Sequence, residues 1–203
     1  MRSYRSISMV FVLILAVAEM ACAQTKDQPK SGGPSPEDMQ KMMALMKPGP
    51  QHEVLAKMAG DWTITGKAWM DPSGTPTDMK PGSQHAEMIL GGRYLQSVWT
   101  GEMMGMPFEG HGLLGYDNFR KEYLMTWVDN MGTAVSTANG SADAAGKVIT
   151  LMGKMDDPST GARDQDVKYV YTIKDDKNVT FEMYGMVPGK GLMKMMETTF
   201  TKK

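Results

Sequence analysis

The residues best suited to chemistry in this chain are three histidines, which stand far apart in the sequence. His52 falls at an expected helix start and His85 at the head of an expected strand, so we predict that both are exposed. His111 differs because Gly110 and Gly112 flank it, and glycines within a strand permit close approach of another group. His111 could therefore ligate haem. No other residue supports haem, so we favour a structural histidine and expect no cofactor.

A second set of candidates combines charged and aromatic side chains beside predicted turns. If the fold draws them together, they could orient a ligand at the mouth of a pocket, since pockets are mostly apolar with a few placed polar groups. The alternative is turn chemistry, because Asp117 and Asp129 each open a turn and Gly91-Gly92 permits positive φ. We favour turn chemistry and keep ligand binding as a hypothesis. The candidate ligand-binding residues are Trp62, Arg93, Tyr94, His111, Tyr116, Trp127 and Asp129.

Methionine is unusually frequent, with 23 residues in the chain. Met39 with Met43, and Met42 with Met46, have the spacing of neighbours on one helix face. Thioethers are soft ligands that select Cu(I), so sequestration of Cu(I) or Ag(I) is one alternative function. A second interpretation is that these residues pack as flexible apolar side chains against the rest of the fold. A third is an adaptable surface that binds another protein.

Sequence signatures of catalysis are missing. The chain has no Gly-x-Ser-x-Gly elbow, no His-Glu-x-x-His motif and no glycine-rich loop before a helix. The carboxylate pairs Asp156-Asp157 and Asp175-Asp176 stand in expected turns, where solvation explains them better than acid or base chemistry. We therefore expect a protein that is not an enzyme.

The first 23 residues have the pattern of an export signal. Basic residues precede an apolar run from Met9 to Ala18, and Ala21-Cys22-Ala23 supplies small residues before a cleavage site. Acylation of Cys22, as in a lipoprotein, is the less favoured alternative. Cleavage would remove two arginines and one glutamate, which moves the formal net charge from −1 to −2. Such a balance provides no basic surface for nucleic acid, and we expect a periplasmic or secreted protein.

A tether and two short helices are expected between the leader and the main domain. Residues 24–34 are polar and rich in Gly, Ser and Pro, which is typical of a mobile segment. Residues 35–59 read as a helical segment in which Ser35 caps the first helix and Pro36 begins it. Pro48-Gly49-Pro50 ends that helix, and a shorter helix follows from about His52 to Met58.

From residue 60 to 203 the apolar period changes to two. About ten short strands follow one another, separated by Gly, Asp, Asn and Pro, with no helical pattern between them. Sequential hairpins favour closure, because closure removes unpaired edges. The sequence therefore predicts an all-β fold, an antiparallel meander barrel. Expected inward side chains are Trp62, Ile64, Tyr94, Val98, Met125, Trp127, Tyr169, Tyr171, Phe181 and Met183.

An ordered set of blocks resembles a known bacterial family. The blocks are His52 to Trp62, Ile89 to Leu95, Phe108 to Gly112, Leu114 to Asp117 and Thr126 to Asp129. Over about residues 51 to 201 they are similar to the domain of unknown function 1579. The resemblance implies a lipocalin-like, or calycin-like, barrel.

In lipocalins a Gly-x-Trp signature opens the first strand, and its Trp closes the barrel floor against an Arg from the last strand. Gly60-Asp61-Trp62 is similar to this signature, while Lys202 and Lys203 are the basic residues at the last strand. Our leading hypothesis is an exported, non-catalytic barrel that binds a small apolar or amphipathic molecule.

Overall fold

The structure is a computed structural model that describes residues 33–71, 74–158 and 160–203. The chain divides into the units Met1–Ser35 and Pro36–Lys203, and the described helices and strands all lie in the second. In the first unit, residues 33–35 are exposed and form neither helix nor strand. The expected leader, Cys22 and most of the expected tether lie outside the described residues. Within the described ranges no helix is both long and apolar enough to cross a bilayer.

Antiparallel strands make up most of the second unit. They run in sequence order as β1 Gly60–Ala68, β2 Thr77–Asp78, β3 Gly82–Ile89, β4 Tyr94–Met103, β5 Met106–Asp117, β6 Glu122–Asp129, β7 Ser136–Ala142, β8 Val148–Asp157, β9 Ala162–Ile173, β10 Asn178–Val187 and β11 Gly191–Lys202. From β3 to β11 each strand pairs with the next one along the chain. This is the meander that the regular spacing of turn residues predicts.

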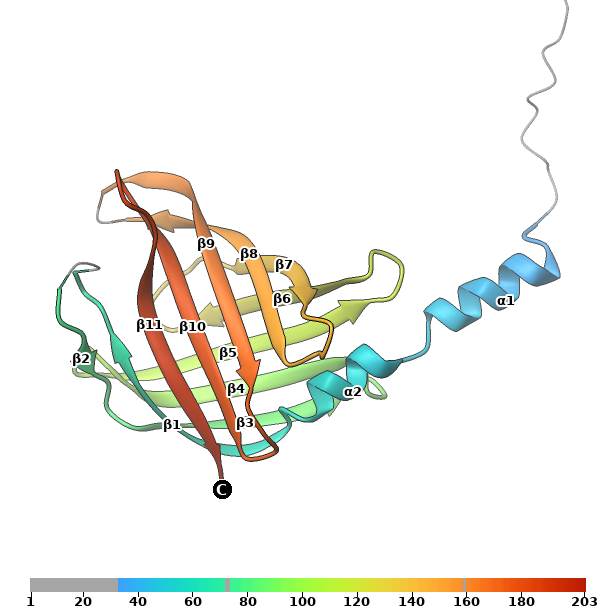
Figure 1. Cartoon of the computed structure of the whole chain (residues 1–203), viewed down its shortest axis with the longest axis horizontal. Coiled ribbons are helices and arrows are strands. Elements are labelled where there is room, and N and C mark those ends of the chain that lie inside the picture. Colours follow the sequence, from blue (N-terminus) through green and yellow to red (C-terminus); the bar gives the residue numbers. More distant parts are fainter. Residues whose placement is uncertain (1–32, 72–73, 159) are drawn as a thin grey trace, which may run out of the picture. The chain divides into compact units, whose positions relative to one another are not determined.

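The sheet closes because the last strand returns to the first. β1 pairs with β3 along one side and with β11 along the other, in a register that runs from Trp62 opposite Lys202 to Ala68 opposite Met196. Figure 1 shows β11 lying beside β1 at this seam. The short β2 pairs only with the end of β1, so ten strands form the closed barrel and β2 is an addition to it. The predicted all-β, antiparallel barrel is confirmed.

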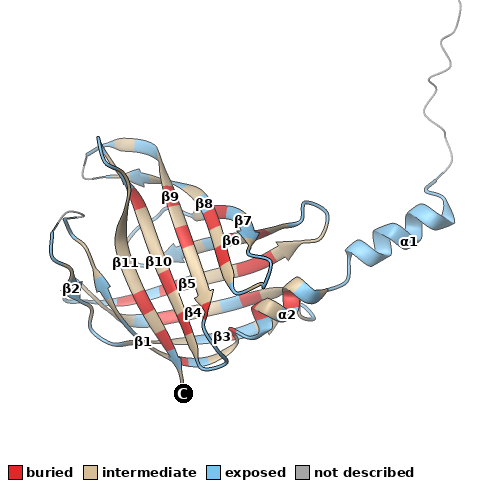
Figure 2. Ribbon diagram, in the orientation of Figure 1, coloured by how far each residue is buried: buried red, intermediate tan, exposed pale blue. Residues whose placement is uncertain are grey.

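Side chains alternate between the inside and the outside of the barrel, as the period of two requires. Figure 2 shows the buried residues spaced along the strands rather than gathered at one end. The expected inward positions are confirmed except on β4, where Leu95 and Trp99 are buried and Tyr94 and Val98 lie on the outer face. This strand has large apolar residues on both faces, so its pattern could not show which face is inside.

Two helices precede the barrel. α1, Pro36–Leu45, buries none of its residues. α2, Pro50–Ala56, begins at the N-cap Gly49 and buries His52 and Leu55. Its Leu55 is 0% exposed and belongs to the barrel core, and α2 contacts β3, β4 and β5. α2 therefore covers the end of the barrel at which β1 begins (Figure 1).

Candidate ligand cavity

The barrel encloses a cavity of about 390 Å³. Its floor lies at the end covered by α2, where Met58 and Trp62 line it. Its lining continues to the opposite end of the barrel, where Met70 is 76% exposed. The cavity therefore reaches the surface at that end, which we call the mouth. The volume falls within the range of about 300–1,000 Å³ that small-molecule sites occupy.

One wall of the cavity is an aromatic cluster. The ring of Trp99 makes edge contacts at 5.8 Å with Phe108, at 6.1 Å with Trp127 and at 5.8 Å with Phe200. Phe108 and Trp127 stack at 6.5 Å. Aromatic pairs prefer edge and offset arrangements because of the ring quadrupole, so the four rings hold one another in position. We call Trp99, Phe108, Trp127 and Phe200 the aromatic wall.

The ring of Trp127 can lie flat against β5 because the residues of β5 that face it are glycines. A Cβ built on Gly110 would lie 2.1 Å from Cζ2 of Trp127, and one on Gly112 would lie 3.2 Å from its Cε3. No real Cβ could occupy the first of these positions. The Gly110-His111-Gly112 pattern therefore makes room for Trp127, rather than for a group bound by His111.

Asp129 contacts both a ring of the aromatic wall and the backbone that follows β6. Its Oδ2 accepts a hydrogen bond from Nε1 of Trp127 at 2.8 Å, and its Oδ1 accepts one from the backbone N–H of Met131 at 3.0 Å. The second bond is the turn role that the sequence predicted. Asp129 also lines the cavity, so the turn role and a role toward a ligand are compatible.

The opposite wall carries tyrosines. The ring of Phe181 lies 6.0 Å from that of Tyr169 and 4.8 Å from that of Tyr171. The hydroxyl of Tyr171 donates to Sδ of Met125 at 3.5 Å. Burial inside the barrel, followed by the effect of Tyr169, raises the pKa of Tyr171 far above its ordinary value. Tyr171 is therefore a neutral hydroxyl group at any physiological pH.

Methionines surround the mouth. Met103 ends β4, Met131 follows β6, and Met155 and Met195 lie toward the same end on β8 and β11. Together with Met70 they form what we call the methionine rim. Unbranched thioethers adapt their shape easily, so this rim can follow ligands of different outline. Sequence analysis did not predict that these residues gather at one end of the barrel. Their common position beside hairpins at one end of the meander was the signal that could have found them.

The floor is built around Trp62, which is 1% exposed. Its Nε1 donates to the backbone oxygen of Met58 at 3.1 Å. Nζ of Lys202 lies 5.1 Å from the centre of its ring, within the range of a cation–π contact. Lys202 of the last strand therefore contacts the ring of Trp62 on the first strand.

Three other candidate residues line a separate cavity of about 300 Å³. Arg93, Tyr94 and Tyr116 lie there beside the connection between α1 and α2. Nη2 of Arg93 donates to the backbone oxygen of Met46 at 2.7 Å, and Nδ2 of Asn118 donates to those of Leu45 and Lys47 at 2.9 and 2.8 Å. We call Arg93 and Asn118 the carbonyl clamp, because they hold the end of α1 and the residues after it.

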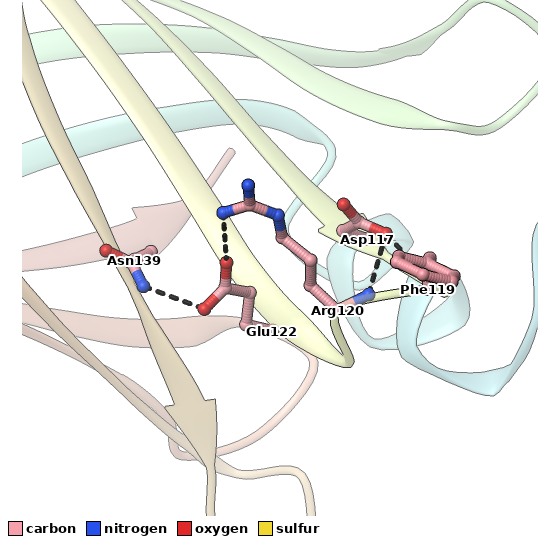
Figure 3. A network of polar contacts seen from close by, with 5 residues as sticks. All are labelled: Asp117, Phe119, Arg120, Glu122 and Asn139. Atoms are coloured by element: carbon pink, nitrogen blue, oxygen red, sulfur yellow. Dashed lines mark hydrogen bonds and ion pairs between the residues drawn. The ribbon is translucent and has the colours of Figure 1, made fainter. Parts of the chain in front are cut away.

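Asp117 has the predicted turn role. Its Oδ1 accepts the backbone N–H groups of Phe119 and Arg120 at 2.7 and 3.0 Å. Figure 3 shows how the network continues through Arg120 to Glu122, which in turn accepts from Asn139 at 2.7 Å. These contacts tie β5, β6 and β7 together, and Asp117 also lines the second cavity.

The three histidines do not lie together in one site. His111 lies on the outer face of β5, where its Nε2 is 2.8 Å from Oε1 of Glu109, and it lines neither cavity. His85 is exposed as expected, and the hydrogen bond that its Nδ1 donates to the Asp61 carboxylate raises its pKa.

The expectation that His52 is exposed is wrong, since it is 5% exposed. Its Nδ1 accepts the N–H of Gly49 at 3.0 Å, and its ring makes an edge contact with Tyr116 at 6.0 Å. In the described part of the chain no three acidic, histidine or cysteine side chains gather as a metal site would need.

The methionines of α1 are exposed. Met39, Met42, Met43 and Met46 have exposed fractions of 46% to 67%. The interpretation that they pack against the barrel is therefore wrong, because α1 buries nothing.

Most of the chain matches a defined protein family. Residues 47–202 match the family described as protein of unknown function DUF1579. The chain belongs to this family. The match begins at Lys47, whose backbone oxygen the carbonyl clamp holds, and it covers the whole DUF1579 barrel.

Two solved structures match this DUF1579 protein at low identity. Rv2717c from M. tuberculosis is 15% identical, with a TM-score of 0.54, over 77% of this chain and 99% of that chain. A redesigned beta barrel, b11L5F_LGL, is 14% identical, with a TM-score of 0.37, over 74% of this chain and 95% of that chain. No curated protein matches the chain. The likeness to Rv2717c concerns the fold alone.

Proposed function

We propose that this DUF1579 protein binds a small apolar or amphipathic molecule in the barrel cavity and does not transform it. The proposal rests on the cavity itself, which provides about 390 Å³ of space between the aromatic wall and the opposite wall that carries Tyr169 and Tyr171. A fully packed barrel of this size would have filled that space with side chains.

The chemistry of the lining supports an apolar ligand with few polar groups. Most lining residues are aromatic, aliphatic or methionine, while Gln84, Ser97, Asp129, Ser136 and the two tyrosine hydroxyls are polar. Apolar contact supplies binding free energy in such a site, and a small number of polar groups set the orientation.

Fluorescence of the cavity tryptophans tests this proposal directly. Purified protein is titrated with decanol, and quenching of tryptophan emission reports binding. The variant Ala68→Phe places a ring in the cavity lining. We expect it to weaken decanol binding by about tenfold or more, because about 1.4 kcal/mol of lost contact suffices for that factor.

The matched control is Thr65→Phe on the same strand. Thr65 is exposed, so a ring there lies outside the barrel and should leave the affinity unchanged. Equal affinities of both variants and the parent protein would place decanol elsewhere. If neither the parent protein nor the control variant binds decanol saturably, ligand binding in the cavity is contradicted.

A further inference from the structure

The formal charge of the main cavity is negative. Among the described residues that line it, Asp129 is the one with a formally charged side chain, and no lysine, arginine or histidine of that part of the chain joins it. The two hydrogen bonds that Asp129 accepts use one site on each carboxylate oxygen. A carboxylate offers about four acceptor sites, so both oxygens can still face a bound cation.

Rings of the aromatic wall lie next to this carboxylate. Trp127 is bonded to it, Trp99 and Phe108 lie within 6.5 Å of the Trp127 ring, and all three line the cavity. The negative face of an aromatic ring attracts cations, most strongly at tryptophan, and pockets of such rings recognise quaternary ammonium groups. The rings and the carboxylate therefore favour the same sign of charge.

The position of Asp129 sets a direction for the ligand. Asp129 is the last residue of β6, next to Met131 of the methionine rim, and so lies toward the mouth. The opposite end of the cavity is lined by the apolar side chains of Met58, Trp62 and Leu95, with the uncharged Gln84 beside Trp62. A head group at Asp129 stays near water while an apolar tail fills the floor, which limits the cost of burying the charge.

Lys194 is the cation that could oppose this arrangement. Its Nζ lies 6.0 Å from the ring centre of Trp69, which lines the cavity. Both Glu182 and Glu197 pair with that nitrogen, and these contacts raise the pKa of Lys194 although burial lowers it. Its charge is therefore more than offset locally.

Resting on the proposed function, we propose that the cavity selects amphiphilic organic cations, with an ammonium head group at Asp129 and an apolar tail toward Trp62. An amphiphile with a carboxylate head group would meet the Asp129 charge and the negative ring faces. The cavity therefore discriminates by the sign of the charge on the head group. A neutral amphiphile of equal length binds with an affinity between those of the cation and the anion.

Calorimetric titration with three probes of equal tail length tests this selectivity. The probes are decyltrimethylammonium, decanol and decanoate, each kept below its critical micelle concentration at neutral pH and low salt. We expect the ammonium probe to bind about tenfold tighter than decanoate, a difference of about 1.4 kcal/mol. Asp129→Asn should reduce this ratio to about twofold, because the amide has nearly the same size as the carboxylate but carries no charge.

The control variant is Asp166→Asn, which removes the same charge from an exposed residue paired with Lys154. It should keep the ratio of the parent protein. Equal or tighter binding of decanoate to the parent overturns cation selectivity, and this result needs no variant to fold. An unchanged ratio in Asp129→Asn also overturns it. Absence of binding by all three probes instead contradicts the proposed function itself.

Discussion

Trp127 is the residue in which the apolar and polar features of the cavity meet. Its ring lies over two glycines on one side and belongs to the aromatic wall on the other, while its N–H bonds Asp129. Sequence analysis placed Trp127 and Asp129 in one candidate site, and both line the main cavity. It also considered His111 as a haem ligand because glycines flank it, although it favoured a structural histidine. The glycines serve the tryptophan on the neighbouring strand, and only the register between β5 and β6 reveals this.

Adding a methyl group at Gly110 should move Trp127. We predict that Gly110→Ala lowers the free energy of unfolding by about 1–3 kcal/mol, as overpacking does, and shifts the tryptophan emission. Urea unfolding followed by fluorescence measures both. Gly132→Ala is the control, because no atom lies within 4 Å of its built Cβ. Equal stability of the two variants would show that Trp127 does not need the glycine.

Tyr171 should make stability depend on pH in the alkaline range. Its pKa is raised in the folded protein, mainly by burial, so the folded state keeps a proton that the unfolded state loses above about pH 10. The stabilisation is therefore complete below that pH and is lost as the pH rises further. We predict that Tyr171→Phe shows a shallower decline in urea midpoint between neutral and alkaline pH. Parallel declines would contradict this assignment.

At the level of elements, the hairpins were predictable and the faces of one strand were not. Turn residues and a period of two mark each strand, but β4 carries Tyr94 and Val98 outside and Leu95 and Trp99 inside. Both faces therefore carry large apolar residues, and on the outer face Tyr94 packs across Gly115, where a built Cβ would lie 2.6 Å from its ring. Alternation locates the inside only when one face is polar.

The carbonyl clamp gives Arg93 and Asn118 a positioning role for the segment before α2. We predict that Arg93→Ala speeds amide exchange in residues 45–52, while changing the free energy of global unfolding by about 1 kcal/mol or less. Hydrogen exchange read by mass spectrometry measures this. Arg120→Ala removes an equal charge from an exposed contact with Glu122 and should leave exchange in residues 45–52 unchanged. Indistinguishable exchange in the two variants would contradict the clamp.

At the scale of the whole molecule, export remains a proposal that rests on the leader sequence. We predict that expression in a bacterial host yields a mature protein beginning at Gln24, found in the periplasm or the medium. Intact mass and N-terminal sequencing of the purified protein measure the cleavage. A chain that begins at an acylated Cys22 would instead support the lipoprotein alternative, and an uncleaved chain in the cytoplasm would contradict export.

The sequence alone determined the strand order, the antiparallel meander and the family, because period, turn residues and ordered blocks are local properties of the chain. Only the tertiary structure decided that the barrel holds a cavity and that Asp129 is its one formally charged lining residue among those described. Empty space depends on the sum of side chains from ten strands and on their register. A shift of one residue exchanges the inside with the outside, and no local pattern contains that sum.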